Sequence, residues 1–315
     1  MSRRSSRRPL APVDLSTRVG SVALPNPVLT ASGTAGHGDE LGRYVDLAAL
    51  GAVVVKSVSA EPWPGNPPPR VHETVAGMIN SVGLQGRGMQ AWLDDELPPL
   101  AGCGARIVAS IWGRSVDAYA KAAELLAGAP PEVVAVEVNV SCPNVEDRGR
   151  MFAHDVSATT EVIAATEGCG RPRWAKLSPN VTDLVSIAAA ARAGGAEAVT
   201  LVNTVMGMVI DVEGRRPLLG NGGGGLSGPA IHPVAVRAVF DVHAALPDLP
   251  IVGVGGVADA VTAIELLMAG ASAVEVGTAT FADPRTVARV RDGMEEWCAQ
   301  RGVSAVAELI GVAHT

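Results

Sequence analysis

Short apolar runs and helix-like segments alternate along this chain from about residue 22 onward. The runs are rich in valine and isoleucine and are bounded by glycine and proline, which is typical of buried β-strands. The pattern predicts eight strands, at residues 22–30, 52–56, 106–111, 133–140, 173–178, 198–202, 251–254 and 271–276. It predicts helices at residues 39–50, 116–126, 153–167, 184–193, 233–246, 258–269 and 286–301.

Eight alternations within about 280 residues favour an α/β fold in which one parallel sheet closes into a (β/α)8, or TIM, barrel. An open, doubly wound sheet is the alternative, but the first strand–helix turn lacks a well-formed G-x-G-x-x-G sequence. We expect one barrel domain over residues 16–315. Residues 1–15 are expected to form a flexible tail, since residues 2–8 carry four arginines, no acid and no apolar segment.

Two long segments, residues 58–85 and 205–228, interrupt the alternation. Both are too long for simple connections, so we interpret them as functional loops. Polar residues gather in these loops and at the carboxyl ends of the predicted strands. In a barrel that end is the catalytic face.

The strand at residues 133–140 runs into Asn139-Val140-Ser141-Cys142-Pro143-Asn144. Pro143 has a fixed φ and keeps Cys142 out of a helix, so the thiol lies on a stiff corner beside amide side chains. Such a thiol suits proton abstraction. A strand end with a small buried cysteine is the alternative interpretation.

Glycines mark the ends of the last two strands. Gly255-Gly256 and Gly277-Thr278 follow them, and Gly228 precedes the helix at residues 233–246. In a barrel these positions form the usual phosphate site, because glycine leaves backbone N–H groups accessible to an anion. Ordinary turn glycines are the alternative.

Two lysines lie at strand ends. Lys176 interrupts an apolar strand, and a buried cation is costly unless it meets an anion. A lysine that extends to solvent, or a Schiff-base amine of an aldolase, would explain it otherwise. Lys56 could bind a substrate carboxylate, a cofactor oxygen or a structural acid such as Asp39.

Amide side chains accompany these lysines at positions 80, 139, 144 and 203. An amide both donates and accepts hydrogen bonds, so it can recognise a ring with alternating N–H and C=O groups. Together with two lysines and a thiol, these amides predict a site for a planar, polar, anionic ring.

Composition narrows the classes of function. The net charge of -7 argues against nucleic acid as the main partner. Cys103, Cys142, Cys169 and Cys298 show no C-x-x-C spacing, and the six histidines share no ligand spacing. We therefore expect no metal site, no disulfide framework and a reducing cytoplasm.

The motifs resemble those of class 1 dihydroorotate dehydrogenases over residues 16–310. They are G-N-P-P-P-R at 65–70, N-S-V-G-L-Q at 80–85, V-S-C-P-N at 140–144, K-L-S-P-N at 176–180, V-N-T at 202–204 and L-S-G-P-A at 226–230. Class 2 enzymes use serine as the base, so Cys142 points to class 1. The first two motifs are more similar to subclass 1B, whose partner subunit carries FAD and an iron–sulfur cluster and passes electrons to NAD.

The resemblance implies an FMN-dependent oxidation of (S)-dihydroorotate to orotate in de novo pyrimidine biosynthesis. Cys142 would remove the C5 proton, and hydride would pass from C6 to flavin N5. The residues implied for orotate are Lys56, Asn80, Ser81, Val82, Gly83, Leu84, Asn139, Asn203 and Thr204. Those implied for FMN are Ser32, Lys56, Ser57, Ser110, Asn139, Lys176, Val202, Gly228, Gly255, Gly256, Gly277 and Thr278. The resemblance also implies a homodimer. Neither nucleic acid nor a membrane is expected as a partner, because the net charge is negative and no apolar run approaches the roughly 20 residues of a membrane span.

The chain departs from the family pattern at two places. Ser110 stands where an asparagine usually contacts FMN, so we expect that contact to be shortened or mediated by water. Residues 146–150 are more charged than usual, which affects a loop expected to cover the substrate.

Another FMN barrel that acts on a dihydropyrimidine-like ring is the alternative function. Such enzymes normally add iron–sulfur domains with many cysteines, and four scattered cysteines argue against those domains here. The chain carries no cluster ligands and no nicotinamide motif, so use of NAD would require a second protein.

Overall fold

The computed structural model describes residues 12–141 and 152–315. Eight parallel strands form one sheet in the order β3-β16-β15-β10-β9-β8-β7-β4. The two outer strands of this order meet: the Gly51 N–H donates to Val28 O at 2.9 Å, and the Thr30 N–H donates to Ala52 O at 3.3 Å. The sheet is thereby closed, and the predicted (β/α)8 barrel is confirmed. Its strands are β3 (Val28–Thr30), β4 (Val53–Val54), β7 (Ile107–Ile111), β8 (Val133–Asn139), β9 (Arg173–Lys176), β10 (Ala198–Leu201), β15 (Ile251–Val254) and β16 (Ala273–Val276).

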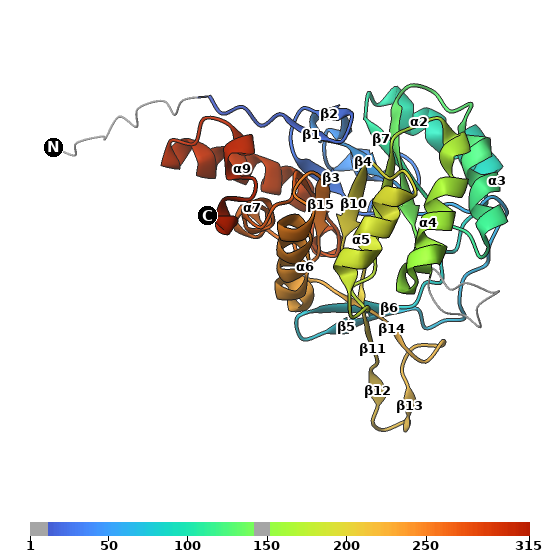
Figure 1. The fold of residues 1–315 in the computed structure, drawn as a ribbon. Coiled ribbons are helices and arrows are strands. Elements are labelled where there is room, and N and C mark those ends of the chain that lie inside the picture. The colour runs from blue at the N-terminus through green and yellow to red at the C-terminus, as the bar shows by residue number, and fades with distance from the viewer. Residues whose placement is uncertain (1–11, 142–151) are drawn as a thin grey trace.

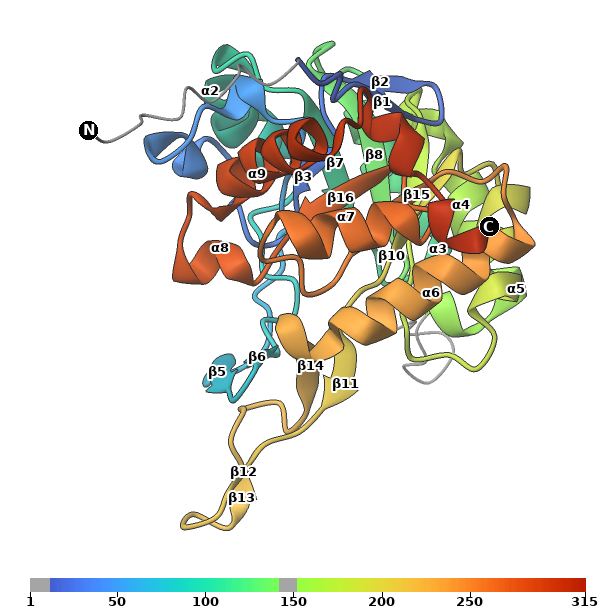
Figure 2. The ribbon, with the colours of Figure 1, turned by 90° about the vertical axis from the view of Figure 1, so that its left-hand side faces the viewer.

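Helices cover the outside of the barrel (Figures 1 and 2). Four of them begin at Ser115, Asp155, Asp183 and Asp259, whose side chains accept the N–H three residues later and so cap the first turn. The longer helices are α3 (Val116–Leu126), α4 (Val156–Ala165), α5 (Leu184–Ala193), α6 (His232–Ala245), α7 (Ala260–Met268) and α9 (Thr286–Arg301). The shorter ones are α1 (Met89–Ala91), the π-helix η3 (Trp92–Glu96), α2 (Leu97–Gly102) and α8 (Ala279–Ala282).

Two predicted elements near the N-terminus are wrong in detail. The helix expected at residues 39–50 is instead a pair of 3-10 helices, η1 (Glu40–Arg43) and η2 (Leu47–Ala49). The two are separate because the Asp46 side chain accepts the Ala48 N–H and caps the start of the second one. The strand expected at residues 22–30 is split by Pro25 and Pro27. Its first part, β2 (Val22–Leu24), pairs with β1 (Thr17–Val19) in a hairpin that lies outside the barrel sheet.

The boundary of the predicted tail falls inside the described region. The Asp14 N–H donates to Ser304 O at 2.9 Å, and the Val306 N–H donates to Asp14 O at 2.8 Å. Asp14 and Ala305 therefore form a parallel β-bridge through these backbone hydrogen bonds. The flexible tail and the division into a single domain stay predictions.

The two long segments contain strands, which the sequence analysis did not predict. A four-stranded antiparallel sheet has the order β11-β14-β6-β5. It lies at one end of the barrel, and the paired strands β12 (Ile210–Asp211) and β13 (Arg216–Pro217) project from it (Figures 1 and 2). A Cβ at Gly77 would come 2.0 Å from Ser227 O, so glycine is required where β6 meets β14. The four strands are β5 (Val71–Thr74), β6 (Gly77–Asn80), β11 (Val205–Gly207) and β14 (Gly224–Ser227).

Side chains fill the barrel in layers. Apolar residues, among them Leu29, Trp174 and Val252, form one buried cluster. Closer to the carboxyl ends of the strands the interior becomes polar, with Glu137, Lys176 and Glu275 all buried. Over the described residues, no helix combines the length and apolar character needed to cross a bilayer.

Candidate active site

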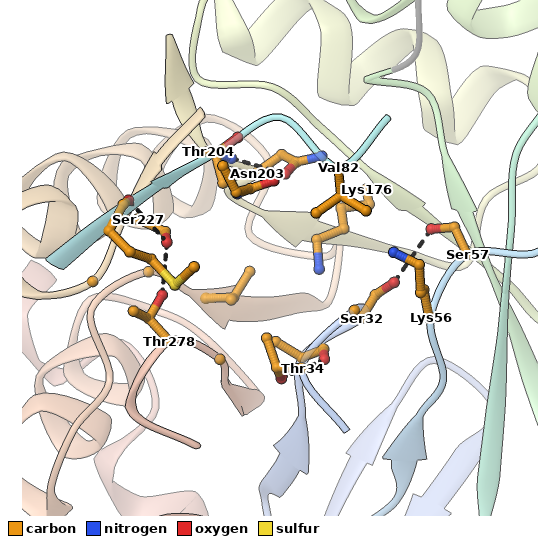
Figure 3. A pocket seen from close by; sticks show the side chains of 18 of the residues that line it. Ser32, Thr34, Lys56, Ser57, Val82, Lys176, Asn203, Thr204, Ser227 and Thr278 are labelled. Carbon is orange, nitrogen blue, oxygen red and sulfur yellow. Dashed lines mark hydrogen bonds between the residues drawn. The ribbon is translucent and has the colours of Figure 1, made fainter. Parts of the chain in front are cut away.

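A pocket opens where the barrel strands end, beneath the antiparallel sheet (Figure 3). Its empty volume is about 1150 Å³ including the open mouth. The structure brings most of the predicted site residues into this lining. They are Ser32, Lys56, Ser57, Asn80, Val82, Gly83, Leu84, Asn139, Lys176, Val202, Asn203, Thr204, Gly228, Gly255, Gly256, Gly277 and Thr278.

Glycines form one end of the pocket. Gly228, Gly255 and Gly256 have φ of 97°, 138° and 71°, which other residues rarely adopt. A Cβ at Gly255 would lie 2.7 Å from Ala235 Cβ, and one at Gly256 would lie 2.6 Å from His232 Cβ. These glycines let the chain turn tightly against α6, and their bare backbone forms a cradle that suits a phosphate.

Side chains hold this glycine turn in place. His232 Nδ1 donates to Gly255 O at 2.7 Å, and its Nε2 lies 3.1 Å from Glu265 Oε2. Beside Gly228 the Thr278 hydroxyl donates to Ser227 Oγ at 2.7 Å (Figure 3). Ser227 lies on β14, so this bond ties the antiparallel sheet to the end of β16.

Amides form the other end of the pocket. Asn203 Nδ2 donates to Asn139 Oδ1 at 3.3 Å, and Asn139 Nδ2 donates to Ser57 Oγ at 3.3 Å. The Thr204 N–H donates to Asn203 Oδ1 at 2.8 Å, which fixes the orientation of that amide (Figure 3). Hydrogen-bonding groups from three strand ends thus face one space.

Lys56 is the partly buried cation of this end. No salt bridge joins it to a carboxylate in the described parts of the chain, so the structural acid considered for it, Asp39, is not its partner there. Burial lowers the pKa of Lys56, and the positive charge of Arg70 lowers it further. A lysine that carries these costs and lines a pocket suits an anionic ligand.

Lys176 projects into the middle of the pocket between these two ends (Figure 3). Its Nζ donates to Glu275 Oε2 at 2.8 Å and lies 3.6 Å from Glu137 Oε1. Burial lowers the pKa of Lys176, but the charges of Glu137 and Glu275 outweigh burial, and the net direction is upward. Lys176 is therefore a charged group in the pocket floor.

The sequence analysis missed both glutamates. Each is an acid in the middle of an apolar strand, Val-Glu-Val in both cases. That isolated charge was the available signal. Several lining residues were also not predicted, namely Ala31, Gly33, Thr34, Val71, Met78, Ser227, Ile231, Val254 and Phe281.

Two predicted site residues lie behind the pocket lining. The Ser81 hydroxyl accepts from Asn66 Nδ2 at 2.9 Å. Ser110 is fully buried: its Oγ lies 2.8 Å from Ser57 Oγ and donates to Glu137 Oε1 at 3.3 Å. Ser110 therefore links the pocket wall to the buried acid.

The predicted base, Cys142, and the charged segment 146–150 lie outside the described residues. Asn139, three residues earlier in the chain, lines the pocket. The Ser141 N–H donates to Asn139 Oδ1 at 3.2 Å. Within residues 12–141 and 152–315, no three His, Cys, Asp or Glu side chains gather in a way that could hold a metal ion.

This lining fits FMN. The glycine end offers the backbone that a phosphate needs, and the hydroxyls of Ser227 and Thr278 border it. The middle offers Lys176 to a ring that gains negative charge on reduction. Ser57 and Asn139 offer hydroxyl and amide groups to the ring edge.

Comparisons with known proteins point to one family. The family model described as dihydroorotate dehydrogenase matches residues 14–297. The chain is 50% identical over 303 residues to the protein of Desulforudis audaxviator named dihydroorotate dehydrogenase B (NAD(+)), catalytic subunit, covering 96% of this chain and 98% of that protein. Proteins of the same name from Trichlorobacter lovleyi and Geobacter sulfurreducens are 46% and 44% identical, covering 94% and 95% of this chain and 97% of each relative.

Proposed function

Because the chain belongs to the dihydroorotate dehydrogenase family, we propose that it oxidises (S)-dihydroorotate to orotate, the redox step of de novo pyrimidine biosynthesis. The resemblance inferred from the sequence motifs is confirmed, and the relatives carry the name of the B type. The observation that carries the proposal is the two-ended pocket, with a glycine cradle and an amide cluster on either side of Lys176.

FMN is the proposed cofactor. Gly228, Gly255, Gly256, Gly277 and Thr278 would hold its phosphate, and Ser32, Ser57, Val202 and Lys176 would surround its ring. When bound, the flavin supplies a hydride acceptor. The buried ammonium of Lys176 favours the negatively charged, reduced form of the ring.

The amide end would bind the substrate. Lys56 pairs with the carboxylate of dihydroorotate, which removes the cost of its burial. Asn80, Asn139 and Asn203 match the alternating N–H and C=O groups of the ring, and Val82, Gly83, Leu84 and Thr204 close around it. Ser81 does not line the pocket and would act indirectly, by accepting a hydrogen bond from the Asn66 side chain.

Cys142 is the proposed general base. Its thiolate takes the C5 proton, so C5 and C6 lose a proton and a hydride, respectively, and the double bond of orotate forms. A free thiol has a pKa of about 8.5, so the reactive form becomes more abundant as the pH rises.

The electron acceptor lies outside this chain in our proposal. The relatives are named catalytic subunits of an NAD(+) enzyme, which supports a partner subunit. We assign to that partner an FAD and an iron–sulfur cluster, on a core made of two copies of this chain. Free Cys103, Cys169 and Cys298 are consistent with a place in the reducing cytoplasm.

Steady-state assays test this function. The purified chain is expected to carry flavin absorbance and to form orotate from dihydroorotate. Fumarate, NAD and a quinone are then compared as acceptors, with and without the partner subunit. Orotate formation with NAD only when the partner is present agrees with the proposal. A purified chain that binds FMN but forms no orotate with any acceptor contradicts it.

A further inference from the structure

Three ionisable side chains meet inside the barrel beneath the pocket. Glu137 comes from β8, Lys176 from β9 and Glu275 from β16. Strands β10 and β15 separate β9 from β16 in the sheet, so the 2.8 Å bond from Lys176 to Glu275 crosses the barrel interior. Only Lys176 of the three lines the pocket.

The two acids are fully shielded from solvent. The side chains of Glu137 and Glu275 are 0% exposed, and that of Lys176 is 7% exposed. One oxygen of each acid has a partner, because Glu275 Oε2 accepts from Lys176 and Glu137 Oε1 accepts from the Ser110 hydroxyl. The other oxygens, Glu137 Oε2 and Glu275 Oε1, have no hydrogen-bond partner among the described residues.

The charges of this cluster do not balance if both acids are ionised. One ammonium against two carboxylates leaves a net charge of minus one in a dry interior, which is costly. Ser110 adds a hydroxyl but no charge. One proton on the acid pair would make the cluster neutral, and it would occupy an oxygen that otherwise has no partner.

We propose that Glu137 and Glu275 share a single proton, and that this acid pair is a positioning device that sets the charge Lys176 presents to the flavin. The protonated acid leaves one carboxylate to compensate the ammonium. The net charge of Glu137, Lys176 and Glu275 together is then zero at physiological pH. The part of this inference that concerns the flavin rests on the proposed function.

The directions of the pKa shifts agree with the geometry. Burial raises the pKa of Glu275 well above its usual range, and the negative charge of Glu137 raises it further, against the opposing effect of Lys176. Lys176 itself stays charged, since its pKa is raised.

A pH dependence follows from the shared proton. Loss of that proton at alkaline pH leaves a net negative charge beneath the ring, which disfavours the anionic reduced flavin and lowers its midpoint potential. The ionisable groups that face one another here are Glu137, Lys176 and Glu275. The side chains added by β7 and β10, Ser110 and Thr200, are uncharged. The amide end of the pocket adds Lys56, whose own deprotonation lowers the potential in the same direction.

Two measurements on the holoprotein test the acid pair. Infrared spectroscopy looks for the C=O stretch of a buried, protonated carboxylic acid. Spectroelectrochemistry gives the midpoint potential of the bound flavin between neutral and alkaline pH. Both are made on the unmodified chain, Glu137→Gln, Glu275→Gln and the exposed control Glu161→Gln on α4.

The expected results are specific. The unmodified chain and the control show the carboxylic-acid band, and either buried substitution removes it, because a single remaining acid is ionised beside Lys176. Each substitution then leaves the net charge of the cluster unchanged. The ratio of reduced to oxidised flavin at neutral pH therefore shifts less than tenfold, and part of the alkaline fall in potential disappears while the part due to Lys56 remains.

Opposite results overturn the proposal. If both acids are ionised, no such band exists in the unmodified chain, and each substitution removes a negative charge. The reduced flavin is then favoured by tenfold or more, which is about 30 mV for a two-electron couple. The infrared test on the unmodified chain stands even where a variant fails to fold. It also stands on protein without flavin, so failure of the proposed function is seen separately as absence of flavin absorbance.

Discussion

The two ends of the pocket are built from different parts of the chain. The glycine end is backbone, in conformations that a side chain would prevent at Gly228, Gly255 and Gly256. The amide end is side chains, with Lys56 held at an electrostatic cost and Asn139 and Asn203 bonded to each other. One end therefore depends on shape and the other on charge, and substitutions at the two ends should fail in different ways.

The largest effect is expected at the amide end, from removing the proposed base. Cys142→Ala should lower kcat by about 10²–10⁴-fold, the usual contribution of a general base. The alkaline rise in turnover should disappear in this variant, and Cys142→Ser should shift or abolish it. The flavin content should not change, because the glycine end of the pocket is intact. Rates measured from pH 6 to pH 10 on flavin-loaded protein check this prediction, and a wild-type profile in either variant would rule out the base assignment.

Loss of the Lys56 charge should weaken substrate binding while it stabilises the protein. Lys56→Met removes a charge-assisted contact of about 1.5–3 kcal/mol, so KM should rise by roughly 10–100-fold. The free energy of unfolding of the ligand-free chain should rise, because a partly buried cation without a carboxylate partner is lost. Steady-state kinetics and denaturant unfolding measure the two effects separately.

The sign of the pH dependence of Lys56 follows from its lowered pKa. Between that pKa and the value of about 10.4 for an unfolded lysine, the unfolded chain binds more protons, so this residue makes stability rise with pH. Substrate affinity should change in the opposite direction and fall as pH rises through the lowered pKa. Lys56→Met should lack both trends.

A substitution at the glycine end should release flavin rather than slow chemistry. Gly256→Ala places a Cβ 2.6 Å from His232 Cβ at a φ of 71°. We expect flavin affinity to fall about tenfold, with a strain of about 1–3 kcal/mol. Turnover per bound flavin should stay near normal, as measured by flavin absorbance and kinetics on the same samples.

Gly170→Ala is the matched control for this variant. Gly170 has a φ of 62°, but a Cβ there would meet nothing within 4 Å. It should share the backbone strain and keep the flavin. Equal flavin loss in both variants would mean that general instability, and not the cradle, explains the effect.

The smallest effect is expected behind the pocket. Ser110→Ala removes the hydroxyl that donates to Glu137, and a buried charged group that loses its partner costs about 1–3 kcal/mol of stability. Because Ser110 does not line the pocket, flavin affinity should change less than about fivefold. Flavin titration and thermal unfolding distinguish this outcome from a direct flavin contact at Ser110.

The sequence predicted the barrel well and the sheet above it poorly. Strand 251–254 and helices 116–126, 184–193 and 286–301 have the predicted bounds, because proline, glycine or capping residues lie at or close to the ends of each segment. Strands β6 and β14 pair Asn80 with Gly225, which are far apart in sequence. Both are short, and β14 begins Gly-Gly, so neither carries a local signal.

The site shows the same division. Lysines, amides and glycines at strand ends were predicted because the barrel fold dictates where strand ends meet. Glu137 and Glu275 were missed because their contact with Lys176 crosses the barrel, and no spacing along the chain encodes such a contact. The role of Ser110 behind the pocket was hidden for the same reason.

The central claim is that this pocket holds FMN and dihydroorotate together, with Cys142 as the base. Anaerobic stopped-flow mixing of the flavin-loaded chain with dihydroorotate tests it most directly. We predict rapid bleaching of the flavin absorbance with one orotate formed per flavin, and bleaching at least about a hundredfold slower in Cys142→Ala. A flavin that stays oxidised under dihydroorotate, or one that is reduced equally fast without the thiol, would contradict the account.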